Sequence, residues 1–265
     1  MTLGSRVSLP WALQARPQLF VLTGTKGSGK DTFKYLARGL EPGAVASIAI
    51  ADWFKKALSQ ATGFDLQSFY DERKEMPYRQ PITMGDIRYN LGQVLYDVPR
   101  VPYYLKEHGL GYDRVSTTLG DNVHSRRVVK SNRELMEWFG FEFFHACFGS
   151  DELHCEITNR QILTDLEKNP HCRYFIITDA RTHFESSWFA KVWREDYQAK
   201  VQTVYIHTDP NLYTPSDTGS GIEKAVANFP SGWFDRIIWN SKLSMDDYCR
   251  DVQDVLLGRS SFKAP

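Results

Sequence analysis

The sequence predicts an α/β fold, a three-layer α/β/α sandwich around a parallel sheet. Short, continuous apolar runs recur along the chain, and such runs are typical of strands buried on both faces of a parallel sheet. Segments with helical periodicity separate most of these runs. The first run ends in a glycine-rich loop that leads directly into a helical pattern. This alternation of strands and helices indicates a sheet covered by helices.

Five apolar runs are predicted as strands. The first, residues 19–23 (LFVLT), ends at a glycine and is expected to be a central strand. The others are residues 46–50, 174–178, 201–207 and 236–239.

Six segments carry a charged face opposite an apolar one and are therefore predicted as helices. They are residues 31–40, 53–61, 132–139, 153–167, 184–193 and 245–257.

We expect one folded domain over residues 18–257, with a core of residues 18–62 and 131–257. Residues 63–130 contain four prolines, many tyrosines and basic residues without a clear period. This pattern indicates an insertion that acts as a lid or as a substrate-binding region, and its aromatic content argues against disorder. The remaining residues, 1–17 and 258–265, are expected to be N- and C-terminal tails.

Composition limits the kinds of partner. The 265 residues include 32 Lys or Arg and 32 Asp or Glu, so the formal net charge is zero at pH 7. Without a global positive field we expect no stable nucleic-acid complex and no attraction to an anionic membrane. Hydrophobic residues make up 42% of the chain, too many for a disordered protein, yet no run approaches the roughly 20 apolar residues of a membrane span. A soluble, globular protein is expected, and the sequence leaves open whether it forms a homodimer.

The four cysteines, Cys147, Cys155, Cys172 and Cys249, show no C-x-x-C spacing, and no signal peptide opens the chain. We therefore expect a reducing cytoplasmic setting, in which the thiols pack as small apolar groups. The seven histidines show no H-x-x-x-H spacing, so no zinc site is predicted.

The clearest motif follows the first predicted strand. It reads Gly24-Thr25-Lys26-Gly27-Ser28-Gly29-Lys30-Asp31-Thr32 and matches G-x-x-x-x-G-K, with a strand before it and a helix after it. Glycines allow successive backbone N–H groups to surround phosphate oxygens, the helix adds its positive N-terminal dipole, and Lys30 reaches the terminal phosphates. The motif predicts a nucleoside triphosphate site, whereas the rival interpretation is a glycine-rich turn that caps a helix.

The residue after the lysine departs from the motif. Asp31 stands where Ser or Thr is expected, and the hydroxyl comes one place later, at Thr32. Either side chain could support the Mg²⁺ that bridges the phosphates, and the sequence does not choose between them.

The loop ending GKDT resembles that of bacteriophage deoxynucleoside monophosphate kinases, which belong to the P-loop nucleotide kinases. Three later segments strengthen this resemblance. Residues 178–185 (TDARTHFE) resemble the family's D-x-R-x-x-x-E segment, and residues 237–247 resemble its final strand, asparagine and last helix. Residues 131–140 more weakly resemble the helix that carries a phosphate-contacting arginine. The resemblance implies a host-cytoplasmic enzyme with a P-loop nucleotide-kinase fold that uses ATP and Mg²⁺ to phosphorylate deoxynucleoside 5′-monophosphates.

Arg181 is the first candidate for the catalytic cation. It lies just past the carboxyl end of a predicted parallel strand, where α/β sheets place their ligands, and its planar guanidinium suits phosphate. An exposed arginine paired with Glu185 is the alternative. Asp179 at the same strand end is predicted to hold a magnesium-bound water, orient Arg181 or contact the acceptor sugar, with helix capping as its rival role. For Glu185 the resemblance implies substrate contact, whereas its position indicates a first-turn glutamate.

Further candidates are more evenly balanced. Arg133 is predicted to clamp phosphate, although an exposed helix-face arginine explains it equally well. Asp52 combines a capping position with a place that faces the acceptor in nucleotide kinases. Arg79 and Arg88 lie among tyrosines that could stack on a base. The resemblance also implies that Asn240 and residues 214–221 bracket the adenine of ATP.

These interpretations define the predicted site. The catalytic residues are Lys30, Arg133, Asp179 and Arg181. The cofactor-binding residues are Gly24, Thr25, Lys26, Gly27, Ser28, Gly29, Lys30, Asp31, Thr32 and Asn240, with Asp31 and Thr32 as the metal candidates. The substrate-binding residues are Asp52, Arg79, Arg88, Arg133, Trp138, Asp179, Arg181 and Glu185.

Three other functions compete with the monophosphate kinase. A P-loop kinase could instead phosphorylate a hydroxyl, such as a hydroxymethylated pyrimidine in phage DNA or a small metabolite. A regulatory module could hydrolyse ATP, although the strand ending at Asp179 carries only one acid followed by an arginine, which favours transfer. Animal phosphomevalonate kinases share a similar GKD loop, but the match to the deoxynucleotide kinases extends to more segments.

Overall fold

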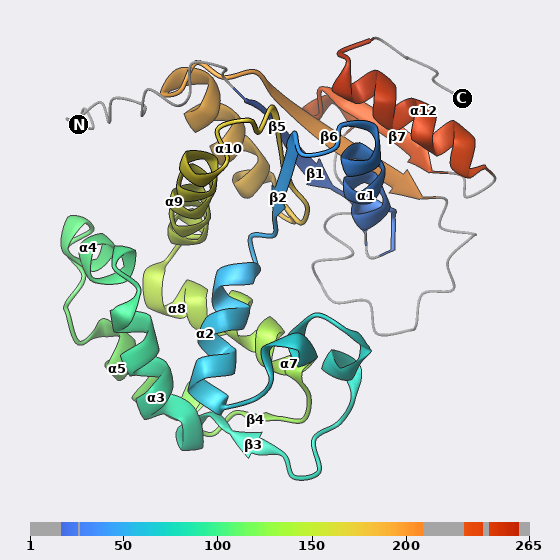
Figure 1. Cartoon of the computed structure of the whole chain (residues 1–265). Helices are drawn as coiled ribbons and strands as arrows, with labels where there is room; N and C mark the ends of the chain where they lie inside the picture. The colour runs from blue at the N-terminus through green and yellow to red at the C-terminus, as the bar shows by residue number, and fades with distance from the viewer. Residues whose placement is uncertain (1–16, 26, 209–230, 241–243, 260–265) are drawn as a thin grey trace. The chain divides into compact units, whose positions relative to one another are not determined.

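The computed structural model describes residues 17–25, 27–208, 231–240 and 244–259 (Figure 1). They divide into two compact units. The sheet unit comprises the described residues up to Ile50 and from Thr158 onward, and the helical unit comprises Ala51–Ile157.

The sheet unit contains a five-stranded parallel sheet in the order β2-β5-β1-β6-β7. The strand register places Phe20 of β1 beside Ile176 of β5 and Gln202 of β6. All five predicted strands are present, so the α/β class and the parallel sheet are confirmed. Their bounds are β1 Gln18–Thr23, β2 Val45–Ile48, β5 Tyr174–Ile177, β6 Val201–Thr208 and β7 Arg236–Asn240.

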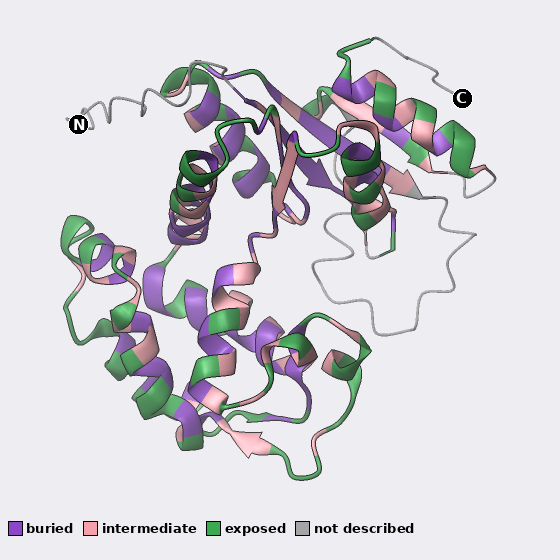
Figure 2. Cartoon of the chain, viewed as in Figure 1, coloured by how far each residue is buried: buried purple, intermediate pink, exposed green. Residues whose placement is uncertain are grey.

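Helices flank the sheet on both faces, because successive side chains of a strand point in opposite directions. Phe20 and Leu22 pack in a cluster with Phe33 and Ala37 of α1 and with residues of α12. On the other face, Thr23 Oγ1 lies 3.1 Å from Ser186 Oγ of α10. The central strands β1 and β5 are buried over most of their length, and buried residues also lie on the helices (Figure 2). This arrangement is compatible with the predicted three-layer sandwich. The helices are α1 Lys30–Leu40, α9 Glu152–Lys168, α10 His183–Glu195 and α12 Met245–Leu256.

Helix α10 is fixed at both ends by specific contacts. Thr182 and Glu185 form a capping box at its start. Near its end, Trp193 Nε1 donates to Asn159 Oδ1 of α9 at 2.8 Å. The loop that follows β5 is therefore held against a rigid helix.

The helical unit has its own hydrophobic core, to which Trp53, Leu58, Leu91, Leu135 and Phe139 contribute. Within it, a short antiparallel pair, β3–β4, joins residues 82–83 to residues 128–129. The elements are α2 Asp52–Thr62, η2 Leu66–Phe69, η3 Glu72–Glu75, β3 Ile82–Thr83, α3 Met84–Asp97, α4 Arg100–Glu107, α5 Arg114–Gly120, α6 Asn122–Ser125, β4 Val128–Val129, α7 Asn132–Glu137, η4 Trp138–Phe143 and α8 Phe144–Phe148.

The helical unit is larger than the insertion predicted at 63–130. It begins at Ala51 and ends at Ile157, so the segments 53–61 and 132–139, expected in the core domain, belong to it. The reason is packing: Trp53 of α2 and Leu135 of α7 bury their side chains in the same cluster as Leu91 of α3. The helix expected at 132–139 also ends at Glu137 and continues as the π-helical turn η4. None of the helices within the described residues is both long and apolar enough to cross a membrane.

A histidine lies in the core of the helical unit. His154 is 4% exposed, and its ring stacks on Phe144 with 3.5 Å between the ring centroids. Trp53 Nε1 donates to His154 Nδ1 at 3.1 Å, so the proton of the neutral ring is on Nε2, and the ring also hydrogen-bonds to the backbone of Gly140. Burial lowers the pKa of His154 from 6.5 to about 3.

This histidine predicts a loss of stability in mild acid. Between pH 6.5 and about 3 the unfolded chain binds one proton more than the native chain, so the free energy of unfolding decreases as the pH falls through this window. The expected slope is up to about 1.4 kcal/mol per pH unit. Urea unfolding between pH 7.5 and 5 measures it. His154→Gln keeps an uncharged acceptor for Trp53 and should flatten the slope, whereas replacement of the exposed His145 should not. Equal slopes in wild type and His154→Gln would contradict this account.

Candidate active site

The glycine-rich loop lies at the carboxyl end of β1, between β1 and α1. Strand β1 is followed by α1 on one face of the sheet, and the adjacent strand β5 is followed by α10 on the other face. The loops after two such strands diverge, which creates the crevice in which open α/β sheets bind ligands. The candidate site is therefore at this edge of the sheet.

Two glycines in the loop are required by close approaches. A Cβ on Gly24 would lie 2.6 Å from the Ile206 carbonyl oxygen and 2.6 Å from Ser28 Oγ, and φ at Gly24 is +158°. A Cβ on Gly29 would lie 2.6 Å from Asn240 Nδ2, and φ at Gly29 is +106°, in the left-handed region. The loop thus passes tightly between β6, β7 and the start of α1.

Lys30 is the first residue of α1, and its side chain turns back over the loop. Its Nζ donates to the carbonyl oxygens of Gly24 at 2.6 Å and Thr25 at 2.7 Å. The ammonium group is therefore held at the mouth of the loop, beside the N-terminus of α1. Phe33 N donates to the Gly29 carbonyl oxygen at 2.8 Å, which starts the helix directly after the loop. Lys26 lies outside the described residues.

The two metal candidates differ in their surroundings. The Asp31 side chain is 77% exposed, and its Oδ1 pairs with Lys34 Nζ at 2.9 Å on the surface of α1. Thr32 is half-buried in the first turn of the same helix. A hydroxyl at Thr32 fits an ion held against the loop better than a carboxylate that faces solvent and is already paired.

Asp179 and Arg181 lie on the segment that connects β5 to α10, and Glu185 lies in the first turn of α10. Asp179 Oδ1 accepts from Ile50 N at 2.5 Å, so the carboxylate fixes the end of the chain that leaves the sheet unit. Glu185 is 9% exposed, and its Oε2 accepts from the backbone N–H groups of Arg181 at 2.6 Å and Thr182 at 2.9 Å. This contact is a capping-box interaction, so it accounts for Glu185 without a substrate.

The guanidinium group of Arg181 differs from the other candidate arginines. Arg181 is half-buried as a residue, and within the described part of the chain its guanidinium group forms no ion pair, so the predicted pairing with Glu185 is limited to the backbone of Arg181. Arg133, in contrast, pairs with Glu75 at 2.9 Å and approaches Glu137 at 3.9 Å. A half-buried cation without a carboxylate partner is available to an anionic ligand.

The other predicted acceptor residues belong to the helical unit, together with Arg133. Asp52 Oδ1 pairs with Lys55 Nζ at 3.5 Å across one turn of α2. Arg79 and Arg88 are exposed, and neither forms an ion pair among the described residues. Trp138, predicted to bind substrate, is 1% exposed and stacks on Phe143. In this structure its ring is therefore part of the core, which corrects the prediction.

Asn240 lies at the end of β7 and contacts the loop, whereas its contact with adenine stays a prediction. Its Nδ2 donates to the Ser28 carbonyl oxygen at 2.7 Å, so the side chain supports the loop from behind. Residues 214–221, predicted to share the adenine contact, lie outside the described residues. Sequence reasoning missed a second support: Tyr248 of α12 donates its hydroxyl to the Gly29 carbonyl oxygen at 2.8 Å. In the sequence, Tyr248 shows only the apolar periodicity of its helix.

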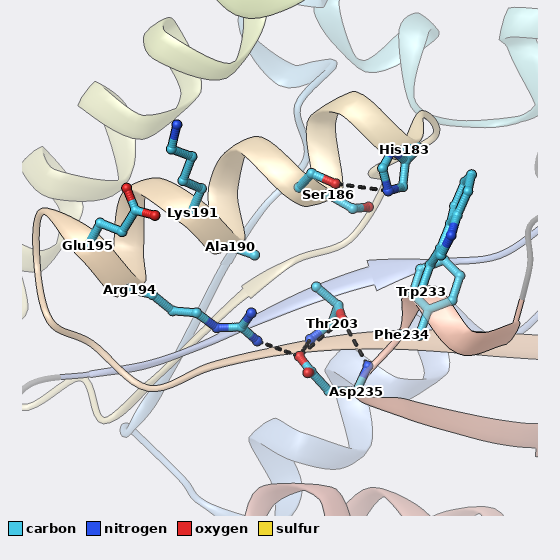
Figure 3. Close-up of a pocket in the computed structure, with 11 residues that line it drawn as sticks. His183, Ser186, Ala190, Lys191, Arg194, Glu195, Thr203, Trp233, Phe234 and Asp235 are labelled. Carbon is cyan, nitrogen blue, oxygen red and sulfur yellow. Dashed lines mark hydrogen bonds and ion pairs between the residues drawn. The ribbon is translucent and has the colours of Figure 1, made fainter.

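A second hollow in the sheet unit, with a volume of about 320 Å³, lies between α10, the start of β6 and the segment before β7 (Figure 3). Asp235 closes one side of it. Asp235 Oδ2 accepts from Arg194 Nη2 at 2.7 Å and from Thr203 N at 2.8 Å. At the other side the ring of His183 lies 3.9 Å from that of Trp233. The sequence showed no sign of this hollow, because its walls come from three distant segments.

Among the described residues no group of three or more His, Cys, Asp or Glu side chains could hold a metal ion. In the comparisons with known proteins, no family model matches the chain and no curated protein matches its sequence.

Proposed function

We propose that this chain is a P-loop nucleotide kinase that transfers the γ-phosphoryl group of ATP to a deoxynucleoside 5′-monophosphate. The observation that carries the proposal is the glycine loop between β1 and α1, with Lys30 Nζ held over it at 2.6–2.7 Å from two loop carbonyl oxygens. Two substrates are required, a triphosphate donor and a monophosphate acceptor.

The donor phosphates would bind at the N-terminus of α1, where the first backbone N–H groups do not donate to carbonyl groups of the same helix. The first N–H groups of a helix have no partner within it, and the helix dipole adds positive charge at the same place. Lys30 would exchange its carbonyl partners for phosphate oxygens when ATP binds. Positioning and charge stabilisation of this kind make up most of phosphoryl-transfer catalysis.

Thr32 is the residue that would support Mg²⁺, since Asp31 faces solvent and pairs with Lys34. The ion would neutralise charge on the donor phosphates and orient them.

Arg181 would contact the transferring phosphoryl group or the acceptor phosphate. Arg181 is a half-buried residue just past the carboxyl end of β5, the strand beside β1, and its guanidinium group lacks a carboxylate partner within the described residues. Asp179 would hold the adjoining connection, because its carboxylate accepts from Ile50 N. The resemblance of residues 178–185 to the deoxynucleotide kinases supports a monophosphate as the acceptor.

An assay of ADP formation with ATP and Mg²⁺ tests the proposal. Four deoxynucleoside monophosphates, their ribose counterparts, and duplex DNA with and without hydroxymethylated pyrimidines serve as acceptors. We expect ADP to form only when a deoxynucleoside monophosphate is present, in equal amount to the diphosphate product. ADP that forms only with modified DNA would show that the acceptor is a hydroxyl group and not a phosphate. ADP that forms without any acceptor would show a hydrolytic module instead.

A further inference from the structure

Two side chains from the C-terminal part of the chain hold consecutive carbonyl groups of the phosphate loop. Asn240 Nδ2 donates to the Ser28 carbonyl oxygen at 2.7 Å, and Tyr248 Oη donates to the Gly29 carbonyl oxygen at 2.8 Å. Asn240 ends β7 and Tyr248 lies in the first turns of α12, so both supports are far from the loop in sequence.

The two hydrogen bonds also determine where the loop's N–H groups point. A trans peptide unit is planar, and its C=O and N–H bonds point in opposite directions. Holding the Ser28 carbonyl toward Asn240 turns the Gly29 N–H away from Asn240. Holding the Gly29 carbonyl toward Tyr248 does the same for the Lys30 N–H. These are the two N–H groups at the junction of loop and helix, where an anion would bind.

The packing around these bonds is tight. A Cβ on Gly29 would lie 2.6 Å from Asn240 Nδ2 and 3.1 Å from Tyr248 Oη. Tyr248 is 5% exposed, and burial raises the pKa of its hydroxyl, so the group stays protonated and remains a donor. The Gly29 carbonyl oxygen accepts from Phe33 N as well, which uses its second lone pair.

We propose that Tyr248, together with Asn240, is a positioning residue for nucleoside triphosphate binding: the two side chains orient the Gly29 and Lys30 N–H groups toward the donor phosphates. This inference rests on the proposed function. It assigns to the last strand and helix a role in phosphate binding.

The test compares Tyr248→Phe with a matched control. Tyr248→Phe removes only the hydroxyl and keeps the ring in the core formed by α1, α12 and the sheet. Tyr197→Phe is the control, because Tyr197 is another tyrosine of the sheet unit whose hydroxyl forms a hydrogen bond: it accepts from Asn159 Nδ2 at 3.0 Å, outside the loop. Two quantities are measured in each protein: amide hydrogen exchange of residues 24–32 without ligand, and the KM for ATP and for the monophosphate acceptor.

We expect Tyr248→Phe to speed exchange in the loop and to raise the KM for ATP by about five- to tenfold, the equivalent of one hydrogen bond. The KM for the acceptor should not change. Tyr197→Phe should leave the loop exchange and both KM values at their wild-type levels. A purely structural hydroxyl would instead lower the melting temperature without a selective effect on ATP.

The possible failures can be told apart. Unchanged loop exchange and an unchanged KM for ATP in Tyr248→Phe would overturn the positioning role and leave the kinase proposal standing. If the wild-type chain binds no ATP, the kinase proposal fails and the positioning role fails with it. Faster loop exchange in Tyr248→Phe would then show only that the hydroxyl group stabilises the packing of the loop.

Discussion

Lys30→Ala is expected to lower the rate of phosphoryl transfer by about 10²- to 10³-fold, the usual effect of removing one pre-positioned charge donor from a transition state. Lys30 Nζ lies over the loop and bonds to the Gly24 and Thr25 carbonyl oxygens, so the ammonium group is already at the place where the terminal phosphates would bind. Steady-state kinetics with saturating ATP and acceptor measure the loss.

Lys34→Ala is the matched control for this prediction. Lys34 lies one turn further along α1, and its Nζ pairs with the exposed carboxylate of Asp31 at 2.9 Å. An ion pair of this kind contributes little to stability and none of the loop geometry depends on it. Activity of Lys34→Ala should therefore stay near that of the wild type. A Lys30→Ala protein that folds and turns over at the wild-type rate would remove Lys30 from the site.

Arg181→Ala is expected to lower transfer by about 10³-fold, at the lower end of the effect of catalytic arginines in phosphoryl transfer. Arg181 is a half-buried residue just past the carboxyl end of β5, and its guanidinium group forms no ion pair among the described residues. Because no partner is left unpaired when the side chain is removed, the fold should keep its stability while the reaction loses a positive charge. Single-turnover and steady-state rates measure the loss, and circular dichroism melting checks the fold.

Arg173→Ala provides the comparison, since Arg173 lies just before β5 at the opposite end of the same strand. Its guanidinium group pairs with Glu41 on the surface. We expect a small change in stability and a normal transfer rate. Arg181→Lys should recover only part of the lost rate, because an ammonium group lacks the planar, two-pronged geometry of guanidinium. Full activity in Arg181→Ala would contradict a role for Arg181 in transfer and leave Arg133, Arg79 and Arg88 of the helical unit as the candidate arginines.

Local sequence patterns determined the strands and the loop. The run at 19–23 is apolar at every position but the last. A strand buried on both faces requires apolar side chains on both faces. Here α1 and α12 cover Phe20 and Leu22 on one face, and α10 lies against Thr23 on the other. The glycines of the loop were also predictable, since only a residue without a Cβ permits the approaches of Ile206 to Gly24 and of Asn240 to Gly29.

Tertiary packing decided what the periodic patterns left open. The amphipathic pattern of the helix after β2 is compatible with a place in either unit. Only the cluster that it shares with Leu91 and Leu135, through Trp53, assigns it to the helical unit. Trp138 reads as a candidate ligand contact, but its ring is buried against Phe143.

The supports of the site have the same origin. Asn240 and Tyr248 hold the loop carbonyls, and Asp235 binds the start of β6. The sequence by itself determined the five strands of the sheet, the helices that flank them and the glycine-rich loop motif, because those depend on residues within a few positions of one another. The supports were decided only in the folded chain, because each joins a side chain to a backbone group whose position depends on how distant strands and helices pack.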